Sequence, residues 1–196
     1  MAYKILGIRD ERADEFEKAN IRVKTVRIEK NKKIRENMSF PPFKFMDLIN
    51  EDFDNSKLRN YFEETRIFFF VWEKDGDVYR VKGCKLWHMP YVDLEVVVRK
   101  EWEEYKRIIQ YGIEFTKIVD ATGKISFQNN LPNKSETEII HVRPHAQKAA
   151  YQFKNGEVYG NVERDANMLP NGEYMTTQSF WINNDYVLRQ LDFGEK

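Results

Sequence analysis

The chain has 196 residues, 41% of them hydrophobic, which is enough for one well-buried globular domain but short for two full domains. Basic and acidic residues number 32 each, so the overall charge does not indicate a nucleic-acid binder. A single cysteine excludes an internal disulfide framework, and without an 18-residue apolar run or a signal-peptide core we expect a cytoplasmic protein with no membrane partner.

The first predicted element is a strand over 21–28, where apolar residues recur, followed by a polar turn at 29–33 that leads into a second strand. Arg22 and Lys24 are then expected on the same face of the first strand, because side chains alternate with a period of two. Seven basic residues crowd the stretch 22–35. They fit either phosphate contacts or a solvated hairpin edge.

The prolines Pro41 and Pro42 are expected to end the second strand. Two short helices are predicted after them, over 43–49 and 56–64. The most apolar run of the chain, 67–72, is short and rich in phenylalanine, which indicates a central strand.

A hairpin and a long helix are predicted in the middle of the chain. The turn sequence 75–77, Asp-Gly-Asp, leads into a strand over 78–82. Apolar residues then recur at helical spacing over 92–111, and Gly112 is a plausible helix stop.

The last third alternates polar segments with short apolar ones. Residues 120–137 are rich in Gly, Asn, Ser and Lys and are expected to form a mobile surface loop. A strand follows at 139–143, then an irregular segment at 144–168, an extended run at 174–177 and a closing helix at 182–191. Helices and strands interleave, hairpins included, so the expected fold class is α/β with a mixed sheet.

The segment from Glu15 to Lys24 has the spacing of a metal-dependent nuclease site. Such a site needs two carboxylates to hold Mg²⁺ and a lysine to position or activate the attacking water. Arg22 stands where the second carboxylate belongs, and a guanidinium would repel the metal ion. The sequence therefore predicts no intact catalytic or metal site at Glu15, Arg22 and Lys24.

Several motifs together resemble one known family in the same chain order. They are Glu15-Phe16 with Ile21-Arg22-Val23-Lys24-Thr25, Lys85-Leu86-Trp87-His88-Met89-Pro90, Arg99-Lys100-Glu101-Trp102-Glu103-Glu104, His141-Val142-Arg143-Pro144-His145-Ala146 and Leu169-Pro170-Asn171-Gly172-Glu173-Tyr174. This set resembles the MutH mismatch-repair endonuclease family. The resemblance implies a restriction-endonuclease-like, MutH-type fold with a central mixed sheet flanked by helices.

The resemblance is greatest to the branch of GATC-cutting type II restriction enzymes of the Sau-three-A kind, in which two MutH-like halves are fused. One half of such an enzyme cleaves, and the other is a degenerate copy that binds DNA as an allosteric effector. Glu15 and Arg22 replace the family's aspartate and glutamate, which favours the non-catalytic C-terminal half.

That assignment implies a single MutH-like DNA-binding domain over 1–196, with a short N-terminal arm, as a fragment of a larger enzyme. Its partners would be double-stranded DNA containing GATC and a catalytic MutH-like half. The domain itself would need no cofactor, whereas the catalytic half would use Mg²⁺.

By the same resemblance, Arg143 donates to a guanine edge, His145 replaces a lysine that senses the adenine, and Tyr174 contributes a hydroxyl or ring edge near the same bases. An arginine can pair with guanine O6 and N7 together. Gln178 is a candidate adenine contact on chemical grounds alone. Lys24 contacts a phosphate or keeps an ion pair with Glu15.

Two other functions remain open. The first is an active Mg²⁺-dependent endonuclease that cleaves at GATC sites with Glu15, Glu17 and Lys24. The second is a protein-interaction module that uses a surface rich in phenylalanine and tryptophan.

Four single residues are expected to be buried. Trp87, Trp102 and Trp181 are expected in the core, and Cys84 is expected to be a small buried side chain.

Overall fold

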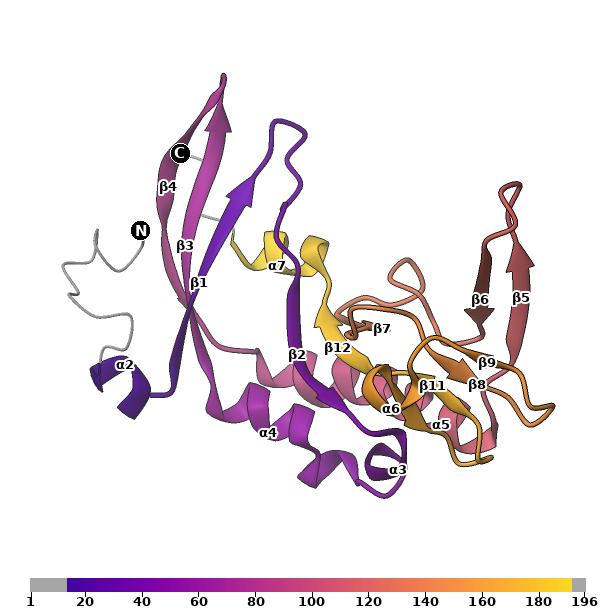
Figure 1. The fold of residues 1–196 in the computed structure, drawn as a ribbon. Coiled ribbons are helices and arrows are strands. Elements are labelled where there is room, and N and C mark those ends of the chain that lie inside the picture. Colours follow the sequence, from indigo (N-terminus) through magenta and orange to yellow (C-terminus); the bar gives the residue numbers. More distant parts are fainter. Residues whose placement is uncertain (1–13, 192–196) are drawn as a thin grey trace. The chain divides into compact units, whose positions relative to one another are not determined.

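The computed structural model describes residues 14–191, and the chain divides into two compact units (Figure 1). The first unit contains the described residues up to Met38, together with 57–95 and those from Ile182 onward. The second contains 39–56 and 96–181. The prediction of one domain over 1–196 stays a prediction.

A three-stranded mixed sheet forms the centre of the first unit (Figure 1). Its strand order is β1-β3-β4, with β1 at Ile21–Ile28, β3 at Arg66–Asp75 and β4 at Val78–Trp87. β1 and β3 are parallel, whereas β3 and β4 form an antiparallel hairpin. The prediction that the phenylalanine-rich run is a central strand is thus confirmed, as is the hairpin turn at Gly76, whose φ is +61°.

The first unit also contains helices and a turn. The helices are α2 at Asp14–Lys18, α4 at Lys57–Glu64 and α7 at Asn184–Gln190. The predicted turn after β1 closes with the Lys32 amide donating to the Glu29 carbonyl at 2.8 Å. Only a single bridge, between Ile28 and Ile34, continues that hairpin.

The prediction that Pro41 and Pro42 end a strand is wrong, because both lie inside β2, Met38–Phe43. β2 is an edge strand of a sheet with the order β2-β12-β7. An edge position tolerates proline, since a backbone N–H that faces away from the sheet needs no partner strand.

The second unit holds most of that sheet and two others. Strand β7 spans Ile140–Pro144 and β12 spans Gln178–Ile182. A four-stranded sheet has the order β10-β11-β8-β9, with β8 at Tyr151–Gln152, β9 at Val158–Tyr159, β10 at Ala166–Met168 and β11 at Tyr174–Thr176. The hairpin of β5, Phe115–Val119, and β6, Ile125–Asn129, completes the strands. Short helices lie at α3 (Phe45–Leu48), η1 (Phe53–Asn55) and α6 (Val162–Asp165).

The long predicted helix is confirmed as a π-helical turn η2, Asp93–Val98, that continues into α5, Arg99–Tyr111. Trp102, Tyr105 and Ile109 on its apolar face are buried. The helix ends at Gly112, whose φ of +121° is unfavourable for a residue with a Cβ atom.

Two segments are more regular than predicted. Residues 120–137 contain β6 instead of a continuous loop, because the ring of Phe127 packs against three aromatic rings. Its ring centroid lies 4.8 Å from that of Tyr151 and 4.9 Å from those of Phe153 and Tyr159. The same cluster orders β8 and β9 within the supposedly irregular segment 144–168.

The architecture is α/β with mixed sheets, which is compatible with a restriction-endonuclease-like fold. Trp87 and Trp102 lie in the core as predicted, whereas Trp181 is only half-buried. Cys84 is exposed on the edge strand β4, so its predicted burial is wrong. Among residues 14–191, every helix is too short or too polar to cross a lipid bilayer.

Candidate nucleic-acid interface

The remnant of the nuclease signature lies on β1 in the first unit. Arg22 is exposed and Lys24 is half-buried, two residues apart and hence on one face of the strand. On the paired strand their register partners are Ile67 and Phe69. The Glu15 backbone belongs to α2, but its side chain lies outside the described residues.

No group of three or more His, Cys, Asp or Glu that could hold a metal ion occurs among the side chains that the structure describes. The positive charge of Arg22 affects a neighbouring side chain, Tyr61. Burial raises the pKa of Tyr61, and the charge of Arg22 opposes that rise. A metal cation at this face of β1 would meet the same positive field.

The basic stretch 22–35 is partly neutralised by carboxylates of the same unit. Its ion pairs are Arg27–Glu36, Lys32–Glu73 at 2.7 Å, Arg35–Glu29 at 3.8 Å and Lys30–Asp77 at 3.9 Å. Most of these side chains are substantially exposed, so each pair contributes little to stability. A DNA phosphate would compete with these carboxylates, which supports the interpretation of this run as a solvated hairpin edge.

Arg143 lies at the end of β7 in the second unit and is exposed. Its guanidinium carbon is 5.0 Å from the ring centroid of Trp181 on the neighbouring strand β12. The side chain of His145 is exposed as well, and its backbone N–H donates to the Thr177 carbonyl at 2.8 Å. Both predicted contact residues are thus available to a ligand.

Hydrogen bonds fix the backbone of the loop after β7 at both ends. At its start the Thr177 carbonyl accepts from His145, while the Thr177 N–H donates to the Asp165 carbonyl at 2.8 Å. At its end the Ala150 N–H donates to the Thr176 hydroxyl at 3.0 Å, and that hydroxyl lies 3.1 Å from the Ala150 carbonyl. Because its backbone is already fixed, this loop would lose little conformational entropy on contact with a ligand.

Gly160 packs directly against the same loop. Its φ is +70°, and a Cβ atom added there would overlap the Ala149 carbonyl oxygen and lie 3.1 Å from the α-carbon of Ala150. Only glycine allows this approach of two backbones. The loop from Pro144 to Ala150 therefore packs against the backbone of Gly160, and a side chain at position 160 would displace it.

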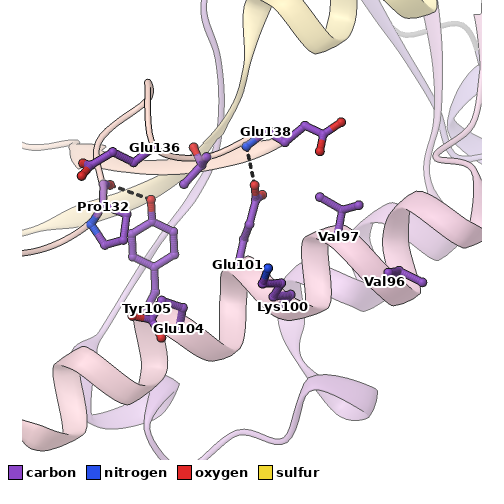
Figure 2. Close-up of a pocket in the computed structure, with 10 residues that line it drawn as sticks. Val96, Val97, Lys100, Glu101, Glu104, Tyr105, Pro132, Glu136 and Glu138 are labelled. Atoms are coloured by element: carbon purple, nitrogen blue, oxygen red, sulfur yellow. Dashed lines mark hydrogen bonds between the residues drawn. The ribbon is translucent and has the colours of Figure 1, made fainter.

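Glu101 on α5 positions the start of β7. Its carboxylate accepts hydrogen bonds from the backbone N–H groups of Glu138, Ile139 and Ile140, with 2.8 Å to the last. Figure 2 shows the bond from Glu138. Burial raises the pKa of Glu101, and the three N–H groups oppose that rise. Glu101 lies in a motif that carries the family resemblance, but its role was not predicted from the sequence.

Glu101 and Tyr105 both line a pocket with a volume of about 520 Å³ (Figure 2). The Tyr105 hydroxyl donates to the Pro132 carbonyl at 2.7 Å, and burial raises the pKa of Tyr105. This bond connects the segment before β7 to α5. Together with the bonds to Glu101, it holds in place the start of β7, the strand that contains Arg143.

The remaining predicted contacts, Tyr174 and Gln178, lie in the same unit as Arg143. Tyr174 is half-buried on β11 and pairs with Gln152. Gln178 is 2% exposed, and its side-chain amide donates to the Thr176 carbonyl at 2.8 Å. Four of the five predicted DNA contacts therefore share one unit, while Lys24 belongs to the other.

These features define an α/β protein with an exposed arginine near the end of β7, a hydrogen-bonded loop after that strand, and Arg22 and Lys24 on one face of β1. No protein-family model matches the chain. The type II restriction enzyme Sau3AI from Staphylococcus aureus is 35% identical over 195 aligned residues, covering 91% of this chain and 40% of that enzyme.

The chain thus spans less than half the length of this relative. The similarity to this restriction enzyme agrees with the resemblance drawn from the motifs. The correspondence of the chain to the non-catalytic C-terminal half stays a prediction.

Proposed function

We propose that this chain is a sequence-specific double-stranded DNA-binding domain of a type II restriction enzyme, that it recognises GATC, and that it does not cleave. It would act as an allosteric effector for a catalytic MutH-like half in the same chain or complex. The observation that carries this proposal is Arg22, which lies on β1. The motif resemblance implies a metal-binding carboxylate at this position. The sequence similarity to a restriction enzyme supports the DNA-binding part.

The sign of the charge at position 22 determines whether this position attracts or repels a metal ion. A carboxylate and a metal ion attract each other, whereas a guanidinium at the same place repels the ion. At a distance of about 4 Å and an effective dielectric constant of about 20, the interaction energy between two unit charges is about 4 kcal/mol. Because about 1.4 kcal/mol corresponds to a factor of ten in rate, replacing the carboxylate by a guanidinium lowers the rate of metal-dependent cleavage by many factors of ten.

Arg143 and the hydrogen-bonded loop after it support the DNA-binding part of the proposal. A planar guanidinium can donate two parallel hydrogen bonds to O6 and N7 of guanine in the major groove. Arg143 is exposed at the end of β7, and the loop after it is fixed by Thr176 and Thr177. Such preorganisation favours specific binding, since the loop need not be ordered by the DNA.

Binding measurements at several salt concentrations test this proposal. In EDTA, the chain is expected to bind a GATC duplex more tightly than a scrambled duplex of the same composition. Raising the salt should weaken binding to both duplexes, because phosphate contacts release counterions. Equal affinity for the two duplexes at moderate salt would contradict GATC recognition.

The second candidate function is an active Mg²⁺-dependent endonuclease, favoured by the similarity to a protein named as a restriction enzyme and by the retention of Lys24. Its acids would be Glu15 and Glu17; Glu17 is exposed on α2. Plasmid cleavage over a Mg²⁺ titration separates the two functions. Cleavage that disappears in Lys24→Ala would establish the enzyme and overturn the silent domain.

A further inference from the structure

Arg164 and Asp165, the last two residues of α6, form an ion pair in the second unit. Asp165 is 4% exposed, and its carboxylate accepts hydrogen bonds from Nε of Arg164 at 3.0 Å and from Nη2 at 2.6 Å. The Arg164 side chain, by contrast, is 59% exposed. The pair therefore has one buried member and one member that solvent or a ligand can reach.

The bonds to Asp165 occupy only one edge of the Arg164 guanidinium. A guanidinium has five N–H donors in a planar fork. The two bonds use the edge formed by Nε and Nη2, and within the described part of the chain no other acceptor is bound to this group. The edge formed by Nη1 and Nη2 is thus left for a ligand. Two parallel N–H donors on such an edge fit the oxygen atoms of a phosphate.

The charges around Asp165 leave an excess of positive charge. Arg164 holds the pKa of Asp165 below its ordinary value against the effect of burial, and the charge of Lys148 adds to this lowering. Lys148 is exposed on the loop after β7, so two cations act on one carboxylate. The other acid of α6, Glu163, lines a pocket beside Tyr174 to which neither member of the ion pair contributes.

The ion pair is connected to the start of the loop after β7 through Thr177. The Thr177 N–H donates to the Asp165 carbonyl at 2.8 Å, and the Thr177 carbonyl accepts from the His145 N–H at 2.8 Å. With one residue between these two bonds, the backbones of Asp165 and His145 lie within roughly 10 Å of each other. Three base steps of about 3.4 Å span a similar length. A phosphate bound by Arg164 would therefore lie in or next to the sequence that Arg143 contacts.

This arrangement differs from the ion pairs of the basic stretch 22–35. In most of those pairs both side chains are substantially exposed, so a phosphate would compete with the carboxylate for the same cation. At Arg164 the carboxylate is buried on one edge of the guanidinium, and a phosphate would approach the other edge. The ion pair also holds the side chain in advance, which lowers the entropy lost on binding.

We propose that Arg164 binds a phosphate of the DNA backbone and thereby fixes the position of the loop after β7 on the duplex. Arg143 would supply the base contact, and Arg164 the contact that is independent of sequence. This inference rests on the proposed function, because it requires that the chain bind double-stranded DNA. It does not require a preference for GATC.

Titrations of Arg164→Ala over a range of salt concentrations test the proposal. Loss of one phosphate contact should weaken binding to the GATC and scrambled duplexes equally, by about ten-fold at about 0.1 M salt. The slope of log K against log salt concentration should become shallower by about 1.

Arg107→Ala is the matched control, because it removes the same charge from the same unit. The Arg107 side chain is 56% exposed and donates from Nε and Nη2 to Glu104 on α5, as Arg164 does to Asp165. Its salt slope should equal that of the wild type. Thermal melting checks that each variant is folded.

A scan with methylphosphonates, which replace one charged backbone linkage by a neutral one, locates the contact. GATC duplexes that carry the substitution at successive linkages in and beside the site are titrated with wild type and Arg164→Ala. At one linkage the wild type should lose about ten-fold in affinity, whereas the variant should lose nothing further. Arg164→Lys keeps a cation beside Asp165 if the alanine variant unfolds. It should show a smaller loss at that linkage than the wild type, because lysine lacks the planar fork.

The outcomes separate this inference from the proposed function. If the chain binds no DNA, both fail. If it binds both duplexes equally and only Arg164→Ala has a shallower slope, GATC recognition fails and the phosphate contact stands. If it prefers GATC but Arg164→Ala keeps the wild-type slope, or weakens binding to the GATC duplex alone, only the phosphate contact is overturned.

Discussion

The guanidinium of Arg143 stacks on the indole ring of Trp181, with 5.0 Å between the guanidinium carbon and the ring centroid. The two residues lie on the adjacent strands β7 and β12. A contact of this kind at an exposed site contributes about 0.5–1 kcal/mol. It holds the planar side chain at the strand end, in the second unit, before any DNA arrives.

Replacing Arg143 should reduce specific binding much more than nonspecific binding. Arg143→Ala is expected to weaken binding to a GATC duplex by about 1–3 kcal/mol, while binding to a scrambled duplex changes little. Arg143→Lys should also lose most of the discrimination, because lysine keeps the charge but lacks the planar fork. Titrations of both duplexes measure this difference, and an equal loss on both would show that Arg143 is only a phosphate contact.

The ring under Arg143 should matter for affinity. Trp181→Leu removes the aromatic face, and we expect GATC binding to weaken by about 0.5–1 kcal/mol. Trp181→Phe keeps a ring and should lose less. Titration of the GATC duplex with both variants measures the effect, and thermal melting controls for repacking. Equal affinities of the two variants at equal stability would contradict a role for the stacking.

Gly160 should be far less replaceable than Gly156, although both have a positive φ, of +70° and +87°. A Cβ atom at position 156 meets nothing within 4 Å, so Gly156→Ala should cost only the conformational strain of about 1–2 kcal/mol. Gly160→Ala adds a clash with the backbone of Ala149 and should destabilise the fold by more than that. Urea unfolding of both variants measures the difference, and equal stabilities would contradict the close packing.

Glu101 should make stability depend on pH in the acidic range. Because its pKa is raised in the folded protein, folding takes up a proton between the ordinary pKa and the raised one. Its contribution is complete below the ordinary value and is lost as the pH rises through the raised pKa. The free energy of unfolding of the wild type, relative to Glu101→Gln, should therefore fall as the pH increases and then level off.

Urea unfolding between about pH 4 and pH 8 measures this dependence. Glu101→Ala should in addition cost about 1–3 kcal/mol at pH 7, because it leaves the backbone N–H groups of Glu138, Ile139 and Ile140 without their acceptor. A difference between wild type and Glu101→Gln that rises with pH would show that the bonds to the carboxylate outweigh its burial.

Local patterns in the sequence were enough to predict several elements. The apolar run of β3 and the helical spacing of apolar residues in α5 are local patterns. Each can be recognised from a short stretch of sequence alone. A strand over 139–143 that ends with Arg143 was also predicted, and β7 extends one residue further, to Pro144.

Features that depend on distant residues could not be predicted in this way. β2 contains Pro41 and Pro42 because it is an edge strand, a property that only the sheet order reveals. The hairpin around Phe127 is ordered by rings more than twenty positions away. The bonds from Glu101 to β7 likewise join residues 37 to 39 positions apart.

The most direct test of the account is one titration of the purified chain against a GATC duplex and its scrambled counterpart, in EDTA and in Mg²⁺, with the DNA analysed afterwards on a denaturing gel. We expect tighter binding to GATC in both buffers and intact DNA in every lane. Equal affinity for the two duplexes, or strands cut at GATC when Mg²⁺ is present, would contradict it.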